Sequence, residues 1–314
     1  MNILVTGGAG YIGSSLISHL TDIAEVAVFD NLFYNQGTLV GKPLTHKRVK
    51  FYNEDVNDWS DNLVYEIDQA DIIIPLAALV GAPLCEQYKE LAIETNYKWF
   101  TKLLNYLSNQ IVIYPNTNSG YGSTGERICT EETPSNPISL YAQTKQDSED
   151  VLINAYDKAI CFRLATVFGW SYRPRTDLLI NNLVKVAKEY GEIKVFDGQF
   201  RRNYVHIKDI VAAFLFVINY NKPEQLYNNV YNLGNDALNM TKIQLVYNIC
   251  NFLNTTYTVD ISKTDPDKRD YIVSSQKLYD LGFDCKIGLE EGVREMNKFY
   301  DLLSETDLDR CRNY

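Results

Sequence analysis

The sequence contains few histidines and no cysteine arrangement that indicates a metal site or a disulfide framework. Its three histidines, His19, His46 and His206, lie far apart, and its six cysteines form no C-x-x-C pair. Zinc sites draw on closely spaced Cys and His ligands, so we expect no metal. Scattered cysteines without a framework spacing are expected to be reduced thiols.

Long hydrophobic runs and positive charge are also scarce. The longest apolar stretch, Ile72 to Cys85, is interrupted by Pro75, Gly81 and Pro83, and it is shorter than the ~20 residues of a membrane-spanning helix. The chain opens on MNILVTGG, without the basic region and cleavage site of a secretory signal, so we expect a cytoplasmic protein. A net charge of -10 repels polyanions, so we expect neither nucleic acid nor a membrane as a partner.

What is present is typical of a folded globular protein. Hydrophobic residues make up 46% and charged residues 22% of the 314 residues, which excludes a disordered, collagen-like or coiled-coil chain. This length fits one large domain or two unequal domains with a substantial core.

The first motif is a glycine-rich turn between a strand and a helix. Ile3–Val5 predicts a short strand, and Gly7, Gly10 and Gly13 follow with the spacing G-x-x-G-x-x-G before a helical pattern. Gly7 permits a tight turn, Gly10 lets the backbone approach a pyrophosphate, and Gly13 lets helix and strand pack closely. The free N–H groups at the helix start can bind phosphate. The motif therefore predicts a dinucleotide site.

An acidic residue at the end of the second strand identifies the dinucleotide. Val26–Phe29 ends in Asp30, at the distance where an acid binds the adenosine ribose. A carboxylate accepts hydrogen bonds from a 2'-hydroxyl and repels a 2'-phosphate, so Asp30 selects NAD over NADP.

Strand and helix patterns then alternate, which predicts an α/β protein with a doubly wound parallel sheet. Polar or small residues follow two of the strands, at Asp55-Val56 and at Leu76-Ala77-Ala78, where such a sheet binds ligands. The segments that alternate are strands at Val49–Tyr52, Asp71–Leu76 and Ile111–Tyr114 and a helix from Cys85 to Leu107.

Tyr141 and Lys145 lie four residues apart in a helical segment, so they share one face of the helix. A tyrosine with an ordinary pKa of about 10 becomes a base near neutral pH only if that pKa falls by about three units, or about 4 kcal/mol. One positive charge at about 4 Å supplies about that much, and Lys145 or an oxidised nicotinamide ring would provide it.

With these motifs the chain resembles an extended short-chain dehydrogenase/reductase of the NAD-dependent nucleotide-sugar epimerase/dehydratase family, over nearly its whole length. The resemblance implies a Rossmann domain at 1–168 plus 205–227, interleaved with a smaller α/β domain at 169–204 plus 228–314 that binds the nucleotide sugar. It also implies that Thr117 joins Tyr141 and Lys145 as the catalytic set. A homodimer would form through a four-helix bundle of the helix near Cys85–Leu107 and the helix that carries Tyr141.

The resemblance further implies two groups of binding residues. The NAD site would comprise Gly7, Gly10, Tyr11, Ile12, Gly13, Asp30, Asn31, Asp55, Val56, Leu76, Ala77, Ala78, Asn96, Tyr141 and Lys145. The nucleoside-diphosphate sugar would contact Asn118, Arg175, Asn181, Arg202 and Arg269. Arginine suits a diphosphate because its planar group donates two parallel hydrogen bonds.

The implied reaction begins with oxidation at C4 of the sugar, which gives a 4-keto intermediate. Relatives that then eliminate water carry Asp-Glu directly after the catalytic threonine, and here those positions are Asn118 and Ser119, which argues against a 4,6-dehydratase. Two outcomes remain: a 4-epimerase, which we favour, or a hexose or heptose 4-dehydrogenase of a surface-polysaccharide pathway that releases the ketone. A non-catalytic NAD-binding sensor on the same fold is the alternative of another class.

Overall fold

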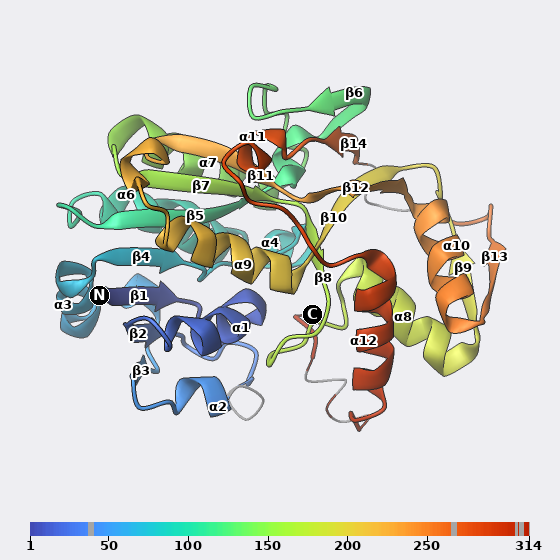
Figure 1. Cartoon of the computed structure of the whole chain (residues 1–314), viewed down its shortest axis with the longest axis horizontal. Coiled ribbons are helices and arrows are strands. Elements are labelled where there is room, and N and C mark those ends of the chain that lie inside the picture. Colours follow the sequence, from blue (N-terminus) through green and yellow to red (C-terminus); the bar gives the residue numbers. More distant parts are fainter. Residues whose placement is uncertain (37–40, 265–268, 305–306, 308–310, 314) are drawn as a thin grey trace.

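The computed structural model describes residues 1–36, 41–264, 269–304, 307 and 311–313. Its largest element is a seven-stranded parallel sheet with the order β11-β7-β5-β4-β1-β2-β3 (Figure 1). The strands are β1 (Asn2–Thr6), β2 (Glu25–Phe29), β3 (Val49–Tyr52), β4 (Ile72–Pro75), β5 (Ile111–Thr117), β7 (Ala159–Leu164) and β11 (Asn229–Leu233). The chain extends outward from β1 in both directions, so the predicted doubly wound α/β fold is confirmed.

Helices cover both faces of this sheet because successive strand side chains point to opposite sides. Ile3 and Val5 of β1 pack in one core with Leu16 of the first helix, whereas Leu4 packs in another core with Leu63 and other residues. The first face carries α1 (Tyr11–Leu20), α2 (Gly41–Leu44) and α9 (Ile207–Ile218), and the second carries α3 (Asp61–Gln69), α6 (Trp99–Leu103) and α7 (Leu140–Ala155).

A smaller part with a core of its own lies beside the carboxyl ends of the central strands (Figure 1). It has a three-stranded sheet of order β12-β10-β8 and the pairs β13-β9 and β14-β6. These strands are β6 (Ser123–Cys129), β8 (Thr166–Phe168), β9 (Glu192–Val195), β10 (Arg201–His206), β12 (Asn235–Thr241), β13 (Thr256–Val259) and β14 (Asp270–Val273). The helices are α8 (Leu179–Tyr190), α10 (Lys242–Leu253) and α12 (Leu289–Tyr300).

The observed sheets divide the chain differently from the predicted boundaries at three strands. β6 falls inside the predicted Rossmann range, but it pairs with β14 of the smaller part. β8 falls inside the predicted Rossmann range, but it pairs with β10 in the three-stranded sheet. β11 falls inside the predicted sugar-binding range, yet it is the edge strand of the seven-stranded sheet through its pairing with β7. The helix α11 (Gln276–Tyr279) also contacts β11. A local pattern identifies a strand but not the distant strand that it joins.

The segment expected as one helix from Cys85 to Leu107 is divided into shorter pieces. It forms α4 (Ala82–Gln87), α5 (Lys89–Ile93), a π-helix η2 (Glu94–Lys98) and α6, with a break at Tyr88. π-Helical turns interrupt the regular backbone hydrogen bonds and are frequent at functional sites. Here the carbonyl oxygen of Asn96 accepts a hydrogen bond from the Ser148 hydroxyl of α7, so η2 is tied to the helix that carries Tyr141 and Lys145.

Three short 3-10 helices complete the described secondary structure, namely η1 (Val56–Asp58), η3 (Asn118–Tyr121) and η4 (Pro223–Gln225). No helix in the described ranges is long and apolar enough to cross a membrane. Within those same ranges, no group of three or more His, Cys, Asp or Glu side chains is placed to hold a metal ion.

Candidate active site

One cavity of about 720 Å³ runs along the carboxyl ends of the central strands and into the smaller part. The glycine turn between β1 and α1 forms one wall of it. Gly7 has a φ of +69, and a Cβ there would lie 2.5 Å from the backbone nitrogen of Ala77, so this position requires glycine. A Cβ on Gly13 would lie 2.6 Å from the carbonyl oxygen of Gly7, which explains the third glycine.

Gly10 lines the cavity together with the other two glycines, but it has fewer close neighbours than they do. A Cβ built there comes nearest to the Gly7 carbonyl oxygen, at 3.0 Å. Gly10 is also the N-cap of α1, and the first helical residues Tyr11 and Ile12 line the cavity beside it. The structure therefore offers a bare backbone and the N-terminus of a ten-residue helix to an anionic ligand, which fits a dinucleotide pyrophosphate.

The carboxylate of Asp30 is held next to this turn. It accepts hydrogen bonds from the backbone N–H groups of Ala9 and Leu32, both at 2.9 Å, and from Gln36 at 3.3 Å. Burial raises the pKa of Asp30, and these hydrogen bonds lower it in part. Asp30 lines the cavity, so its position is compatible with the predicted contact to the adenosine ribose.

All of the other predicted cofactor residues except Asn96 also line the cavity. Asn31 donates a 2.7 Å hydrogen bond to Asp55, which in turn caps η1. Asn96 does not line the cavity but holds Leu79, because its Oδ1 accepts from the Leu79 N–H and its Nδ2 donates to the Leu79 carbonyl, both at 2.9 Å. The predicted residues that line it here are Asn31, Asp55, Val56, Leu76, Ala77 and Ala78.

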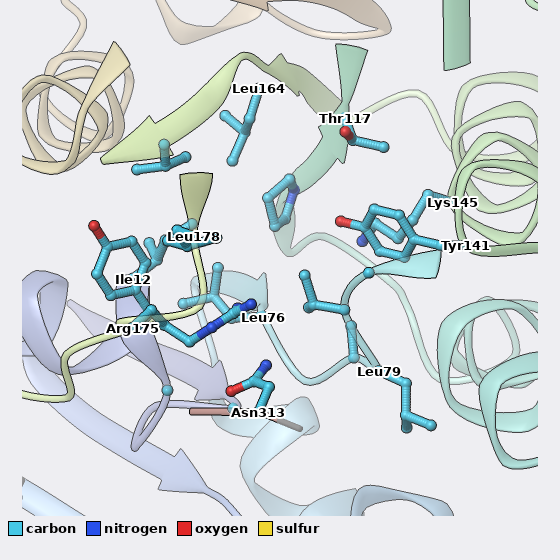
Figure 2. Close-up of a pocket in the computed structure, with 18 of the residues that line it drawn as sticks. Ile12, Leu76, Leu79, Thr117, Tyr141, Lys145, Leu164, Arg175, Leu178 and Asn313 are labelled. Atoms are coloured by element: carbon cyan, nitrogen blue, oxygen red, sulfur yellow. The ribbon is translucent and has the colours of Figure 1, made fainter. Parts of the chain in front are cut away.

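The three proposed catalytic residues meet at another wall of the cavity (Figure 2). Thr117 is the last residue of β5, whereas Tyr141 and Lys145 lie one turn apart at the start of α7. Ser139 caps this helix by accepting a hydrogen bond from the backbone N–H of Ala142. Thr117 donates from its hydroxyl to that of Ser119 at 3.0 Å, and a hydrogen bond with Thr117 lowers the pKa of Tyr141.

Burial shifts the pKa of Tyr141 and of Lys145 in opposite directions. It raises the pKa of Tyr141 to about 12, although the nearby charges of Arg175 and Arg269 lower it in part. It lowers the pKa of Lys145 to about 7, with partial compensation from anions that include Glu149. The Lys145 ammonium also lies 4.0 Å from the centre of the Tyr114 ring. Burial thus favours the neutral form of each side chain.

The predicted sugar-binding residues divide into those that line the cavity and those behind it. Arg175, Arg202 and Arg269 line it. Arg175 is also paired with Asp177 at 2.5 Å, and Arg269 donates to the Ser119 hydroxyl. Arg202 stacks over the ring of Tyr271.

Asn118 and Asn181 lie outside the lining. Asn118 is 1% exposed, and its amide has no hydrogen-bond partner among the residues that the structure describes. Asn181 supports the site from behind, because its Oδ1 accepts from the Gly169 N–H at 3.0 Å and its Nδ2 donates to the Arg175 carbonyl at 2.8 Å.

Comparison with known proteins agrees with this geometry. The model of the NAD dependent epimerase/dehydratase family matches residues 3–234. The chain belongs to that family. It is 26% identical to the dTDP-D-glucose 4,6-dehydratase of Mus musculus over 95% of this chain and 88% of that relative. It is 30% identical to the UDP-glucose 4-epimerase of Streptococcus mutans over 76% of this chain and 77% of that relative.

A solved structure shares the fold of this family member. The UDP-glucuronic acid 4-epimerase from Bacillus cereus, in complex with UDP-glucuronic acid and NAD, matches with a TM-score of 0.84 at 22% identity, covering 97% of this chain and 100% of that one. Family membership confirms the resemblance drawn from the motifs and confirms NAD as the cofactor. Because the relatives include both epimerases and dehydratases, the family establishes the class of enzyme but not the reaction.

Several residues that line the cavity were not among the predicted binding residues of this family member, including Ser119, Arg173 and Asn313. Ser119 lies two residues after Thr117, so its place in the same motif was a usable signal. Arg173 had only its neighbour Arg175 as an indication. Asn313 had no indication in the sequence. Its segment is placed at the site by contacts with residues about 140 positions away, such as the hydrogen bond from Arg173 to the Arg312 carbonyl.

Proposed function

We propose that this chain is a nucleotide-sugar 4-epimerase, which oxidises C4 of a nucleoside-diphosphate sugar and returns the hydrogen to the opposite face. The observation that carries the proposal is the arrangement of Thr117, Tyr141 and Lys145 on one wall of a cavity that also contains the glycine turn. The arginines Arg202 and Arg269 line the same cavity and suit the diphosphate.

In the proposed reaction the phenolic oxygen of Tyr141 takes the proton of the C4 hydroxyl, and the Thr117 hydroxyl orients the reacting oxygen. NAD, when bound, supplies the hydride acceptor. A pKa of about 12 must fall by about five units for Tyr141 to act near neutral pH, or about 7 kcal/mol. A phenolate beside Lys145 favours the ammonium form of the lysine, and each charge stabilises the other.

The side chains after Thr117 support epimerisation over elimination of water. Elimination requires an acid and a base, and neither Asn118 nor Ser119 titrates near neutral pH. The Ser119 hydroxyl is already engaged by Thr117 and by Arg269. These side chains favour epimerisation even though the chain is 26% identical to a 4,6-dehydratase. The UDP-glucose 4-epimerase of Streptococcus mutans, at 30% identity, favours the other outcome.

A product analysis tests the proposal. The purified protein would be incubated with UDP-glucose, UDP-glucuronic acid and dTDP-glucose in turn, while absorbance at 340 nm and the proton NMR spectrum of the sugar are followed. An epimer that accumulates without net nicotinamide reduction supports the proposal. A 4-keto sugar formed with an equal amount of NADH identifies a 4-dehydrogenase instead. A result with neither an epimer nor cofactor reduction, for any of the three nucleotide sugars, indicates an NAD-binding sensor.

A further inference from the structure

A segment remote in sequence from the glycine turn, Cys311–Asn313, closes part of the same cavity. It is fixed to the loop that follows β8, because Thr176 donates to the Cys311 carbonyl from its backbone N–H at 2.8 Å and from its hydroxyl at 3.3 Å. Arg173 donates to the Arg312 carbonyl at 3.0 Å. Asn313 then lines the cavity, and Figure 2 shows its side chain among those of the other residues that line it.

Arg173 and Asn313 each carry a buried polar atom without a partner. Arg173 is 2% exposed and Asn313 is 9% exposed, and both line the cavity. Within the part of the chain that the structure describes, neither the Nε of Arg173 nor the Oδ1 of Asn313 takes part in a hydrogen bond. A buried donor or acceptor without a partner is costly. These two atoms therefore call for a ligand that supplies both an acceptor and a donor.

The charge around Arg173 specifies that ligand further. Burial lowers the pKa of Arg173 to about 10, and the charge of Arg175 lowers it as well. Arg175 is compensated by Asp177, whereas Arg173 forms no ion pair within 4.0 Å among the described residues. The guanidinium stacks 4.9 Å from the ring centre of Tyr34, which follows Asp30 in the chain. A buried cation at this position favours an anionic group next to a ribose.

We propose that Arg173 and Asn313 are cofactor ligands, with Arg173 donating to the diphosphate of NAD and Asn313 accepting from a ribose hydroxyl. The segment Cys311–Asn313 then covers the bound cofactor and slows its release. Slow release of NAD suits an enzyme that regenerates its cofactor in each cycle. The assignment of Arg173 and Asn313 as cofactor ligands depends only on NAD binding, so it holds whichever sugar is oxidised.

The test compares Asn313→Ala and Asn313→Asp with Arg312→Ala as the matched control, because the exposed Arg312 side chain is adjacent and its backbone carbonyl contact is retained. The affinity for NAD is measured by calorimetry, and the release of NADH is measured by stopped-flow fluorescence. Loss of one hydrogen bond in Asn313→Ala is expected to weaken NAD binding about threefold to tenfold. Asn313→Asp weakens it more, because a carboxylate repels the diphosphate.

Faster NADH release in Asn313→Ala, with Arg312→Ala within about twofold of the parent, supports the assignment. Equal melting temperatures of the unliganded variants show that the fold is unchanged. Affinity of Asn313→Ala for NAD equal to that of the parent would overturn the assignment. So would tighter binding, since it would mean that the segment competes with the cofactor for the cavity.

Discussion

Tyr141 and Lys145 show how one physical cause shifts the pKa values of two neighbouring side chains in opposite directions. Lys145 is buried and Tyr141 is partly buried. Burial disfavours the charged form, so the pKa of Tyr141 rises to about 12 and the pKa of Lys145 falls to about 7. The tyrosine is therefore protonated near neutral pH in the unliganded chain. Binding of cofactor and sugar must bring the charge that turns it into a base.

Substitution of Tyr141→Phe removes the titrating oxygen and leaves the ring to pack. We expect folding and NAD binding to survive, and turnover on the accepted sugar to fall at least ~100-fold, or roughly 3 kcal/mol in the barrier. Thr117→Val is expected to lose less activity, because Thr117 orients the reacting oxygen rather than transferring the proton. The rate of nicotinamide reduction is measured by stopped flow. A Phe variant that reacts at near the parent rate, with substrate shown to be bound, would remove Tyr141 from the role of base.

Lys145→Met tests the burial of the lysine through the pH dependence of stability. The pKa of about 7 in the folded chain lies below the ordinary value of 10.5, so between these two pH values the unfolded chain binds more protons. The free energy of unfolding of the parent therefore rises with pH across this range. We expect the Met variant to be more stable than the parent below about pH 7, with a difference that shrinks toward about pH 10. Urea unfolding measures this, and a difference independent of pH contradicts the shift.

At the scale of the elements, an ion pair buried between α7 and β7 supports the catalytic residues. Arg163 of β7 contacts Glu149 of α7 at 2.6 Å. Glu149 also accepts a 2.7 Å hydrogen bond from the Asn116 side chain of β5, and Asn116 in turn accepts one from the backbone N–H of Thr117. The chain of contacts joins the helix that carries Tyr141 and Lys145 to the strand that ends in Thr117.

Glu149→Gln is expected to destabilise the fold by about 3 kcal/mol, because it leaves the buried guanidinium of Arg163 without its counter-charge. Replacement of both partners, as Glu149→Gln with Arg163→Met, is expected to recover part of that loss. The matched control is Glu94→Gln at the exposed pair with Lys98, for which a loss below about 1 kcal/mol is expected. Urea unfolding compares the three variants, and equal losses for the buried and the exposed pair would refute the support role of Glu149.

Local patterns predicted the elements well wherever neighbouring residues determine them. The strand expected at Val49–Tyr52 is β3 with the same bounds, and the helix expected to carry Tyr141 is α7. The expected continuous helix from Cys85 to Leu107 was wrong, because its interior is shaped by Asn96, which bonds to Leu79 and to Ser148 in other elements. The residues of the candidate site follow the same pattern. Those that belong to a sequence motif could be recognised, whereas Asn313 reaches the cavity through the contacts of Cys311 and Arg312 with residues far away in the sequence.

At the scale of the whole molecule, the helices predicted to form a homodimer present a mainly polar surface. The exposed large hydrophobic side chains between residues 85 and 107 are Tyr88 and Tyr106, and α7 exposes polar residues such as Gln143 and Asp150. We expect light scattering at micromolar concentration to give the mass of a dimer, twice the 36.0 kDa of the chain. A mass of one chain would contradict the prediction, and no other proposal made for the molecule depends on it.

The most direct measurement of the central claim follows the hydrogen at C4 of the sugar. The nucleotide sugar that the enzyme accepts would be deuterated at C4 and converted in ordinary water, and product and nicotinamide would be examined by NMR and mass spectrometry. A 4-epimerase that uses Tyr141 as its base returns the same hydrogen, so deuterium is expected at C4 of the epimer and in no other product. Deuterium found in free reduced nicotinamide beside a 4-keto sugar, or at C6 of a dehydrated product, would contradict the proposed epimerase.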